Sequence, residues 1–237
     1  MILRYAASCS LFILATLSLT EASHAQAEPT PEKKKEGAMV RLACVQNLEG
    51  EDEKVTLAKQ TEDGKWIEFG DLGLRSTLIT EWIHVPVGLN HLVRKNGTEL
   101  TSIGSFTISP TMKGVILILV PDVKKKVYRV QLIDPANLQF QKGKALIVNY
   151  ASIPALVNLG KQTKTLAPGQ QLVETITADA SGMHPMLIGH LDENKKTVLC
   201  YDHRVSSNPN TRTFILLFPD PDTVIRAITL SEFGPFE

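Results

Sequence analysis

The sequence has little of what catalytic and nucleic-acid-binding proteins usually display. Charge of one sign is not in excess, because 25 basic residues are matched by 25 acidic residues among 237. A nucleic-acid binder normally shows a basic patch that displaces counterions from phosphates, and none is visible, so we expect no nucleic-acid partner. The Gly-x-Ser-x-Gly and His-Glu-x-x-His signatures are also missing. We therefore expect a protein that is not an enzyme and needs no cofactor.

Cysteine is scarce, with three in the chain. Cys9 lies in an apolar N-terminal stretch, while Cys44 and Cys200 are far apart and lack the spacing of a redox or zinc pair. Both share strand parity with apolar neighbours, so we interpret them as core-facing free thiols. The alternative is a Cys44–Cys200 disulfide, which an oxidising compartment would allow.

Apolar runs long enough to span a bilayer are absent. The N-terminus has Arg4, a short apolar run from Cys9 to Leu19, and the small-x-small sequence Ala25-Gln-Ala27. This pattern is typical of a signal peptide over residues 1–27, and the alternative is an uncleaved membrane anchor. Residues 28–37 are rich in Pro, Lys and Glu and predict a flexible linker. We expect a protein of the periplasm or the secreted fraction, without a transmembrane segment in the mature chain.

Helical apolar periodicity is also absent, so the sequence predicts an all-β fold. Two stretches, Val115–Asp134 and Thr213–Glu232, align without a gap at an offset of 98. Each contains a wholly apolar strand, a Pro-Asp turn and an alternating strand. Asp122 and Asp220, the shared acids, are interpreted as turn residues, because proline fixes φ and aspartate accepts backbone hydrogen bonds.

A second pair of segments extends this internal repeat. Val55–Thr61 recurs as Val157–Thr163 at an offset of 102. We interpret the change of offset as a shorter connection in the second copy, where the first has the Gly-rich stretch Trp66–Leu74. The sequence therefore predicts two tandem immunoglobulin-like β-sandwich units, over residues 38–135 and 139–237.

The stretch from Trp66 to Leu74 is the first candidate site. Trp66, Asp71 and Arg75 form a candidate ligand-binding loop, in which Trp66 could stack on a sugar ring. For Trp82, by contrast, packing in the core is the preferred interpretation.

Histidines of the second unit are the second candidate site. A hairpin turn at Asn194-Lys195 would place His203 opposite Met186 and His190 opposite Leu199. His184, His203 and Tyr201 would then share one face as a polar cluster, while Asp202 would point to the other face. Two histidines without a third ligand are weak evidence, so we expect no metal site.

These patterns favour an exported, non-catalytic binding or scaffolding protein of the cell envelope. Its partner would be another envelope protein or a cell-surface polymer, held by sheet edges and loops. The alternatives are a carbohydrate-binding module that uses Trp66 and, least favoured, a metal-dependent hydrolase centred on His184 and His203.

Overall fold

The computed structural model describes residues 36–50, 53–76, 78–159, 162–177 and 182–234. The predicted signal peptide and all but the last two residues of the predicted linker lie outside the described residues. Lys35–Glu237 form one compact unit. The described residues form β-strands and no helix, so the predicted all-β fold class is confirmed.

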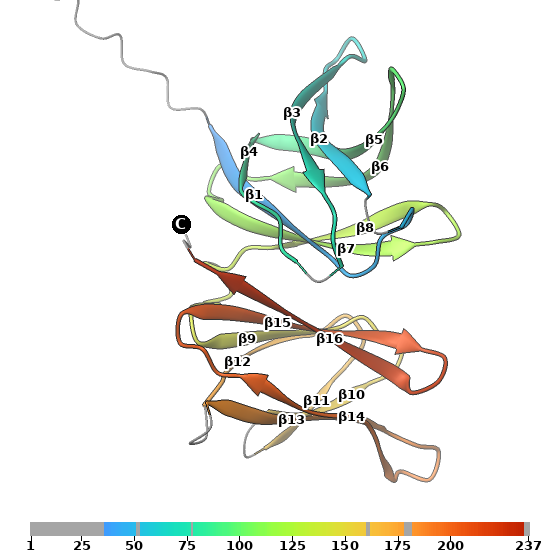
Figure 1. Ribbon diagram of the computed structural model, residues 1–237, viewed down its shortest axis with the longest axis vertical. Helices are drawn as coiled ribbons and strands as arrows, with labels where there is room; N and C mark the ends of the chain where they lie inside the picture. Colours follow the sequence, from blue (N-terminus) through green and yellow to red (C-terminus); the bar gives the residue numbers. More distant parts are fainter. Residues whose placement is uncertain (1–35, 51–52, 77, 160–161, 178–181, 235–237) are drawn as a thin grey trace, which may run out of the picture. The chain divides into compact units, whose positions relative to one another are not determined.

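The described residues form sixteen strands, which divide into two sets of eight (Figure 1). The first half comprises β1 (Gly37–Cys44), β2 (Lys54–Gln60), β3 (Trp66–Gly73), β4 (Ile83–Pro86), β5 (Gly88–Asn96), β6 (Glu99–Ile108), β7 (Gly114–Asp122) and β8 (Val127–Ile133). The second half comprises β9 (Lys144–Asn149), β10 (Ala155–Leu159), β11 (Thr163–Leu166), β12 (Gln171–Thr175), β13 (Met183–Leu191), β14 (Thr197–Ser206), β15 (Thr211–Asp220) and β16 (Val224–Phe233).

Each half has two four-stranded sheets, and the strand order is the same in both halves. The first half has the orders β4-β1-β7-β8 and β3-β2-β5-β6, and the second has β12-β9-β15-β16 and β11-β10-β13-β14. In each half the first strand runs parallel to the seventh, as β1 with β7 and β9 with β15. The other pairs between these strands are antiparallel.

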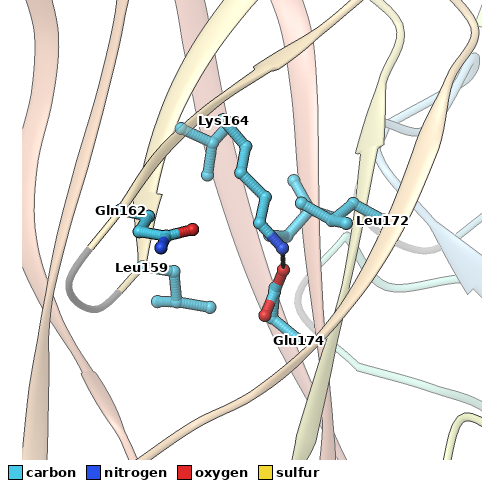
Figure 2. Close-up of a pocket in the computed structure, with 7 residues that line it drawn as sticks. Leu159, Gln162, Lys164, Leu172 and Glu174 are labelled. Atoms are coloured by element: carbon cyan, nitrogen blue, oxygen red, sulfur yellow. Dashed lines mark hydrogen bonds and ion pairs between the residues drawn. The ribbon is translucent and has the colours of Figure 1, made fainter.

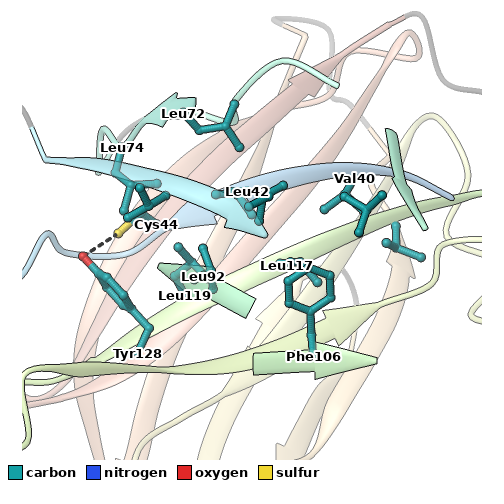
Figure 3. Packing of buried hydrophobic residues seen from close by; sticks show 14 of the residues in the cluster. Val40, Leu42, Cys44, Leu72, Leu74, Leu92, Phe106, Leu117, Leu119 and Tyr128 are labelled. Carbon is teal, nitrogen blue, oxygen red and sulfur yellow. Dashed lines mark hydrogen bonds between the residues drawn. The ribbon is translucent and has the colours of Figure 1, made fainter. Parts of the chain in front are cut away.

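The two sheets of each half enclose an apolar core, which makes each half a β-sandwich. In the first half, Leu42 and Leu117 from one sheet pack in one cluster with Leu92 and Phe106 from the other (Figure 3). In the second half, a comparable cluster joins strands β9 and β15 to β10 and β13. The predicted sandwich architecture is therefore confirmed in both halves.

The apolar central segments of strands β7 and β15, residues 115–120 and 214–217, are buried on both faces. Along β7, Val115, Leu117 and Leu119 point into the first sandwich core. The alternate residues, Ile116 and Ile118 among them, belong to a third cluster that includes Leu146, Val148, Phe214 and Leu216 of the second half. A strand covered on both faces has no solvent side to require polar residues, which explains the unbroken apolar sequences. Burial of each such side chain contributes about 1.5–3 kcal/mol.

A buried ion network also joins the two halves. The Glu232 carboxylate, which has no exposed surface, accepts hydrogen bonds from Arg212 Nε at 2.7 Å and Nη2 at 2.8 Å. Arg41 of β1 donates to the same carboxylate at 3.1 Å. Two arginines around one carboxylate supply the pairing that a buried charge needs.

Most of the stretch Trp66–Leu74 is a strand, because Trp66–Gly73 form β3, so the interpretation of this stretch as a loop was wrong. β3 continues through Gly70, Asp71 and Gly73 and pairs with β2 along its length. Gly70 permits this because a Cβ atom there would lie 2.7 Å from Ile83 Cδ1. The second half has a counterpart in β11, which the sequence did not predict and which occupies the same place in its sheet.

The register also corrects the alignment of the two halves. The partner strands of β5 and β13 each have a β-bulge, which shifts the register after Leu92 and after Ile188. Leu92 and Ile188 also pair with Leu57 and Val157 respectively. The structure therefore aligns Leu57 with Val157, whereas the offset of 102 aligned Val55 with Val157. The shift is two residues, which preserves the alternation of faces and hides the error from the sequence pattern.

Candidate functional site

The two closing hairpins, β7–β8 and β15–β16, reverse direction at the Pro-Asp turns that the sequence predicted. Asp122 Oδ1 accepts the backbone N–H of Lys125 at 3.1 Å. Asp220 Oδ1 accepts the backbone N–H groups of Asp222 at 2.9 Å and Thr223 at 2.8 Å. These backbone hydrogen bonds lower the pKa of Asp220. Both acids therefore serve their own turns, which confirms that interpretation.

The second hairpin turn is one residue shorter than the first. Asp122 pairs with Val127, whereas Asp220 pairs with Val224, so the gapless alignment fails by one residue beyond the turn. When a one-residue gap is placed in the alignment at the second turn, an arginine occupies the same position in both hairpins. Arg129 lies opposite Val120, the residue before Pro121. Arg226 lies opposite Phe218, the residue before Pro219.

Alternation along β8 and β16 places these arginines beside the third apolar cluster. On β8, Arg129 shares a face with Ile133, and on β16, Arg226 shares a face with Leu230. Ile133 and Leu230 are buried in the cluster between the halves, while both arginines are exposed. The apolar cluster between the two halves is therefore bordered by an arginine on β8 and by another on β16.

Both hairpins line one hollow of about 1030 Å³, which we call the hairpin groove. Segment 45–50 and residues 75–76 of the first half complete its lining, together with Tyr150, which follows β9 in the second half. The full lining is Val45, Gln46, Asn47, Gly50, Arg75, Ser76, Val120, Pro121, Val123, Arg129, Tyr150, Phe218, Pro219, Asp220, Pro221, Arg226 and Ile228.

The charged side chains that line the hairpin groove are mainly basic. Arg75, Arg129 and Arg226 are all exposed, and Asp220 is the only acid in the lining. Within the described part of the chain, the guanidinium groups of Arg75, Arg129 and Arg226 make no side-chain hydrogen bond or ion pair, although the charge of Arg226 helps to lower the pKa of Asp220. Three unpaired guanidinium groups around one hollow make it a site of positive potential.

The floor of the groove is aromatic and aliphatic. The rings of Tyr150 and Phe218 are stacked, with centroids 5.1 Å apart and planes inclined by 10°. The Tyr150 hydroxyl donates a hydrogen bond to Gln131 Oε1, and burial raises the pKa of Tyr150. The tyrosine is therefore neutral, and its ring offers an apolar face next to Val120 and Ile228.

Glu53 stabilises segment 45–50, which lines one side of the hairpin groove, by hydrogen bonds and an ion pair. Its Oε2 accepts hydrogen bonds from the Tyr128 hydroxyl at 2.6 Å and from the Leu48 N–H at 2.7 Å. Its Oε1 pairs with Arg94 Nη2 at 2.8 Å. Burial by itself would raise the pKa of Glu53, but the hydrogen bonds from Tyr128 and Arg94 hold it below the ordinary value. A charged carboxylate thus ties segment 45–50 to strands β5 and β8.

Cys44 lies beside this clamp, with Sγ 3.8 Å from the Tyr128 hydroxyl (Figure 3). Burial raises the pKa of Cys44 to about 11, so the thiol is protonated and unreactive at neutral pH. Cys200 is half-buried, and both cysteines are free, which confirms the prediction of two free thiols.

The predicted ligand loop does not form one site. The Trp66 ring is half-buried, with its edge against His91 at a centroid distance of 5.2 Å. Asp71 accepts hydrogen bonds from Thr56 Oγ1 at 2.6 Å and Lys95 Nζ at 3.0 Å. Asp71 and Arg75 line a separate hollow of about 310 Å³, of which Trp66 is not part.

Trp82 is not in a core, so the preferred interpretation of this residue was wrong. It is half-buried, and the Arg41 guanidinium lies over its ring, 4.4 Å from the centroid. Arg41 also pairs with Glu232, so Trp82 covers one member of the buried ion network.

The histidine cluster is only partly as predicted. His203 lies opposite Met186, as expected, and its ring stacks on Tyr201 at 4.2 Å. His184 is 8% exposed and its Nδ1 is within hydrogen-bond distance of the Thr177 carbonyl oxygen. Among the described residues, no three His, Cys, Asp or Glu side chains are grouped as metal ligands.

A β-bulge displaces the other predicted histidine pair. His190 lies opposite Val198, and Leu199 lies opposite Gly189, so the expected His190–Leu199 pair was wrong. Cys200 is the extra residue of the bulge, since it lies between the partners of Gly189 and Ile188.

A smaller hollow of about 230 Å³ opens into the second sandwich core (Figure 2). Lys164 of β11 and Glu174 of β12 form an ion pair across it, above Leu159 and Leu172. Because its two charged groups satisfy each other, this hollow lacks the unpaired charge that distinguishes the hairpin groove.

Sequence reasoning singled out Arg75 and both Pro-Asp turns but missed Arg129, Arg226 and Tyr150. A signal was present: each wholly apolar strand is followed, beyond its turn, by an arginine in an alternating strand. Recognising that the two arginines correspond requires a one-residue gap in the turn, which the gapless alignment did not contain.

Within the described part of the chain, the structure has no helix of the length and hydrophobicity that a membrane crossing requires. No protein family matches the sequence, and no curated protein shows significant similarity to it.

Proposed function

We propose that this protein is a non-catalytic binding protein that holds its partner in the hairpin groove. The observation that carries the proposal is the set of three exposed arginines, none of them in a side-chain ion pair, that line this hollow next to the half-buried rings of Tyr150 and Phe218. A guanidinium group presents five donors in a planar fork, which suits recognition of an oxyanion on a partner. Protein surfaces with unpaired arginines and aromatic rings are typical of binding sites.

The fold supports a further part of the proposal, that the two halves are copies of one unit. Both halves have the same strand order, the same parallel first and seventh strands, and an arginine at the same place in the closing hairpin. We propose that each is an immunoglobulin-like sandwich in architecture and that the pair arose by duplication. Duplication would explain how one groove acquired two corresponding arginines.

We also propose that the protein works outside the cytoplasm, in the periplasm or the secreted fraction. The support is the sequence pattern of a signal peptide over residues 1–27, with cleavage after Ala27. N-terminal sequencing of protein recovered from the exported fraction tests this, and a mature chain that begins at Glu28 is the expected result. An intact Met1 in that fraction would contradict it.

The binding proposal is tested by comparing three forms of the full chain as bait for envelope components. The forms are the wild type, the groove variant R129Q/R226Q, and the control K124Q. Lys124 is exposed in the β7–β8 turn but does not line the groove, so K124Q removes a charge from the same hairpin. We expect a component identified by mass spectrometry to be retained by the wild type and K124Q but not by R129Q/R226Q. Equal retention by all three forms would refute the groove as the binding site. Deletion of Trp66–Leu74 is not a useful test, because it would remove strand β3.

A further inference from the structure

The hairpin groove combines charge and apolar surface in a way that narrows the class of partner. We propose that it binds an extended peptide segment in which an apolar side chain lies between acidic side chains. The inference rests on the proposed binding function and adds the chemistry of the ligand.

The first step is the placement of the charges. Arg129 and Arg226 hold corresponding positions in two hairpins that line one hollow, so the groove has a basic group on the hairpin of each half. Arg75, contributed by the segment between β3 and β4, is a third. Like charges that share a hollow repel each other, and a ligand with several separate carboxylates relieves that repulsion.

The second step is the apolar floor. The stacked rings of Tyr150 and Phe218 lie in the lining together with Val45 and Ile228. A phosphate polymer would satisfy the arginines but would leave this apolar surface without a complementary group. A peptide can place an aliphatic or aromatic side chain over the rings and carboxylates over the arginines at the same time.

The third step is the size of the hollow. About 1030 Å³ is at the upper end of the range of about 300–1,000 Å³ that small-molecule sites occupy. A segment of several residues uses such a volume, and an extended chain presents alternate side chains to opposite sides. Different side chains of one segment can therefore contact the arginines and the apolar residues of the lining at the same time.

The experiment measures binding of a fluorescein-labelled synthetic hexapeptide to the full chain by fluorescence anisotropy at low salt. The peptide has Leu-Phe at its centre and two carboxylate side chains on each side. Three competitors accompany it: the same peptide with Ser-Ser at the centre, the same peptide with amides in place of the side-chain carboxylates, and inorganic polyphosphate. Circular dichroism and thermal unfolding show that each protein variant is folded.

We expect R129Q/R226Q to raise the Kd of the acidic peptide about 25-fold, or about fivefold for each exposed ion pair that is lost. K124Q should leave the Kd within about twofold, because Lys124 does not line the groove. Both the Ser-Ser and the amide peptides should compete at least about tenfold more weakly than the parent peptide. Binding of the parent peptide should weaken as salt is added.

Equal affinity of the acidic and amide peptides, or an equal Kd for R129Q/R226Q and K124Q, would overturn the proposal. No measurable binding of the parent peptide at millimolar concentration would also overturn it. If polyphosphate competes better than the peptide, and its binding depends on Arg129 and Arg226, the ligand is a phosphate polymer. That result would overturn the peptide proposal and leave the proposed binding function intact. If none of these probes binds and all three baits retain the same envelope components, the proposed function itself fails.

Discussion

Replacing Glu53 with glutamine should destabilise the first half of the protein and loosen one wall of the hairpin groove. The carboxylate receives hydrogen bonds from the Tyr128 hydroxyl, from Arg94 and from the N–H groups of Leu48 and Glu49. Its side chain is 1% exposed and that of Arg94 is 12% exposed, so water does little to screen their interaction. Glutamine keeps the shape but offers one acceptor oxygen instead of two.

The expected loss follows from these contacts. If the amide oxygen keeps the hydrogen bonds of Tyr128 and Leu48, the amide nitrogen must face Arg94, a donor facing a donor. A hydrogen bond to a charged group contributes about 1.5–3 kcal/mol, and the remaining bonds weaken when the acceptor loses its charge. We therefore expect E53Q to lower the free energy of unfolding by about 3 kcal/mol at pH 7. Arg94 retains an ion pair with Glu49 at 3.1 Å, which limits the loss.

Urea unfolding followed by circular dichroism measures this difference, with E68Q as the matched control. Glu68 pairs with Lys95 at 2.7 Å, but its side chain is 43% exposed, so its loss should cost less than about 1 kcal/mol. The folded-state pKa of Glu53 lies below its ordinary value, so its contribution is complete at neutral pH and is lost as the pH falls through the folded-state value. The gap between wild type and E53Q should therefore narrow below about pH 4. A gap that is the same at pH 7 and pH 3.5, or an E53Q as stable as E68Q, would refute the reasoning.

Two further predictions test the packing of particular residues. In folded chain that begins at Glu28, a thiol reagent at pH 8 should modify Cys200 faster than Cys44, because Cys44 is buried and Cys200 is half-buried. Burial raises the pKa of both thiols, that of Cys44 to about 11. Equally rapid modification of both before urea is added would contradict the buried geometry. Gly189→Ala should cost at least about 2 kcal/mol in urea unfolding, since its Cβ would lie 2.3 Å from the Val198 carbonyl oxygen. Gly73→Ala, which meets nothing within 4 Å, should cost less than about 0.5 kcal/mol, and equal losses for the two variants would argue against this bulge.

The strands that the sequence revealed most clearly are those whose environment is simplest. The central residues of β7 and β15, 115–120 and 214–217, are covered on both faces, so all of them are apolar and no register needs to be known. β11, in contrast, was missed because Thr163–Leu166 is short and mostly polar. It is a strand because β10 offers it a paired edge, which is a property of the folded sheet and not of the segment itself.

The candidate site was harder to predict because it depends on where neighbouring strands meet. Arg129 and Arg226 occur in ordinary alternating strands, and only the lengths of the two turns bring them into correspondence. The predicted pairing of His190 with Leu199 failed for a related reason, since the bulge at Cys200 moves the register by one residue. Turn length and bulges are set by close contacts between backbones, and strand alternation in a single sequence does not record them.

The parallel pairing of β1 with β7 also bears on the order in which the protein is assembled. Residues 39–44 of β1 pair with residues 114–119 of β7, so β1 cannot form this pairing until β7 has been synthesised. In the same way, β9 cannot pair with residues 213–217 until β15 has been synthesised. Contacts so distant along the chain delay folding, because the intervening loop must close before they are made. A nascent chain that stops before residue 114 therefore leaves one edge of β1 unpaired and open to association with other chains.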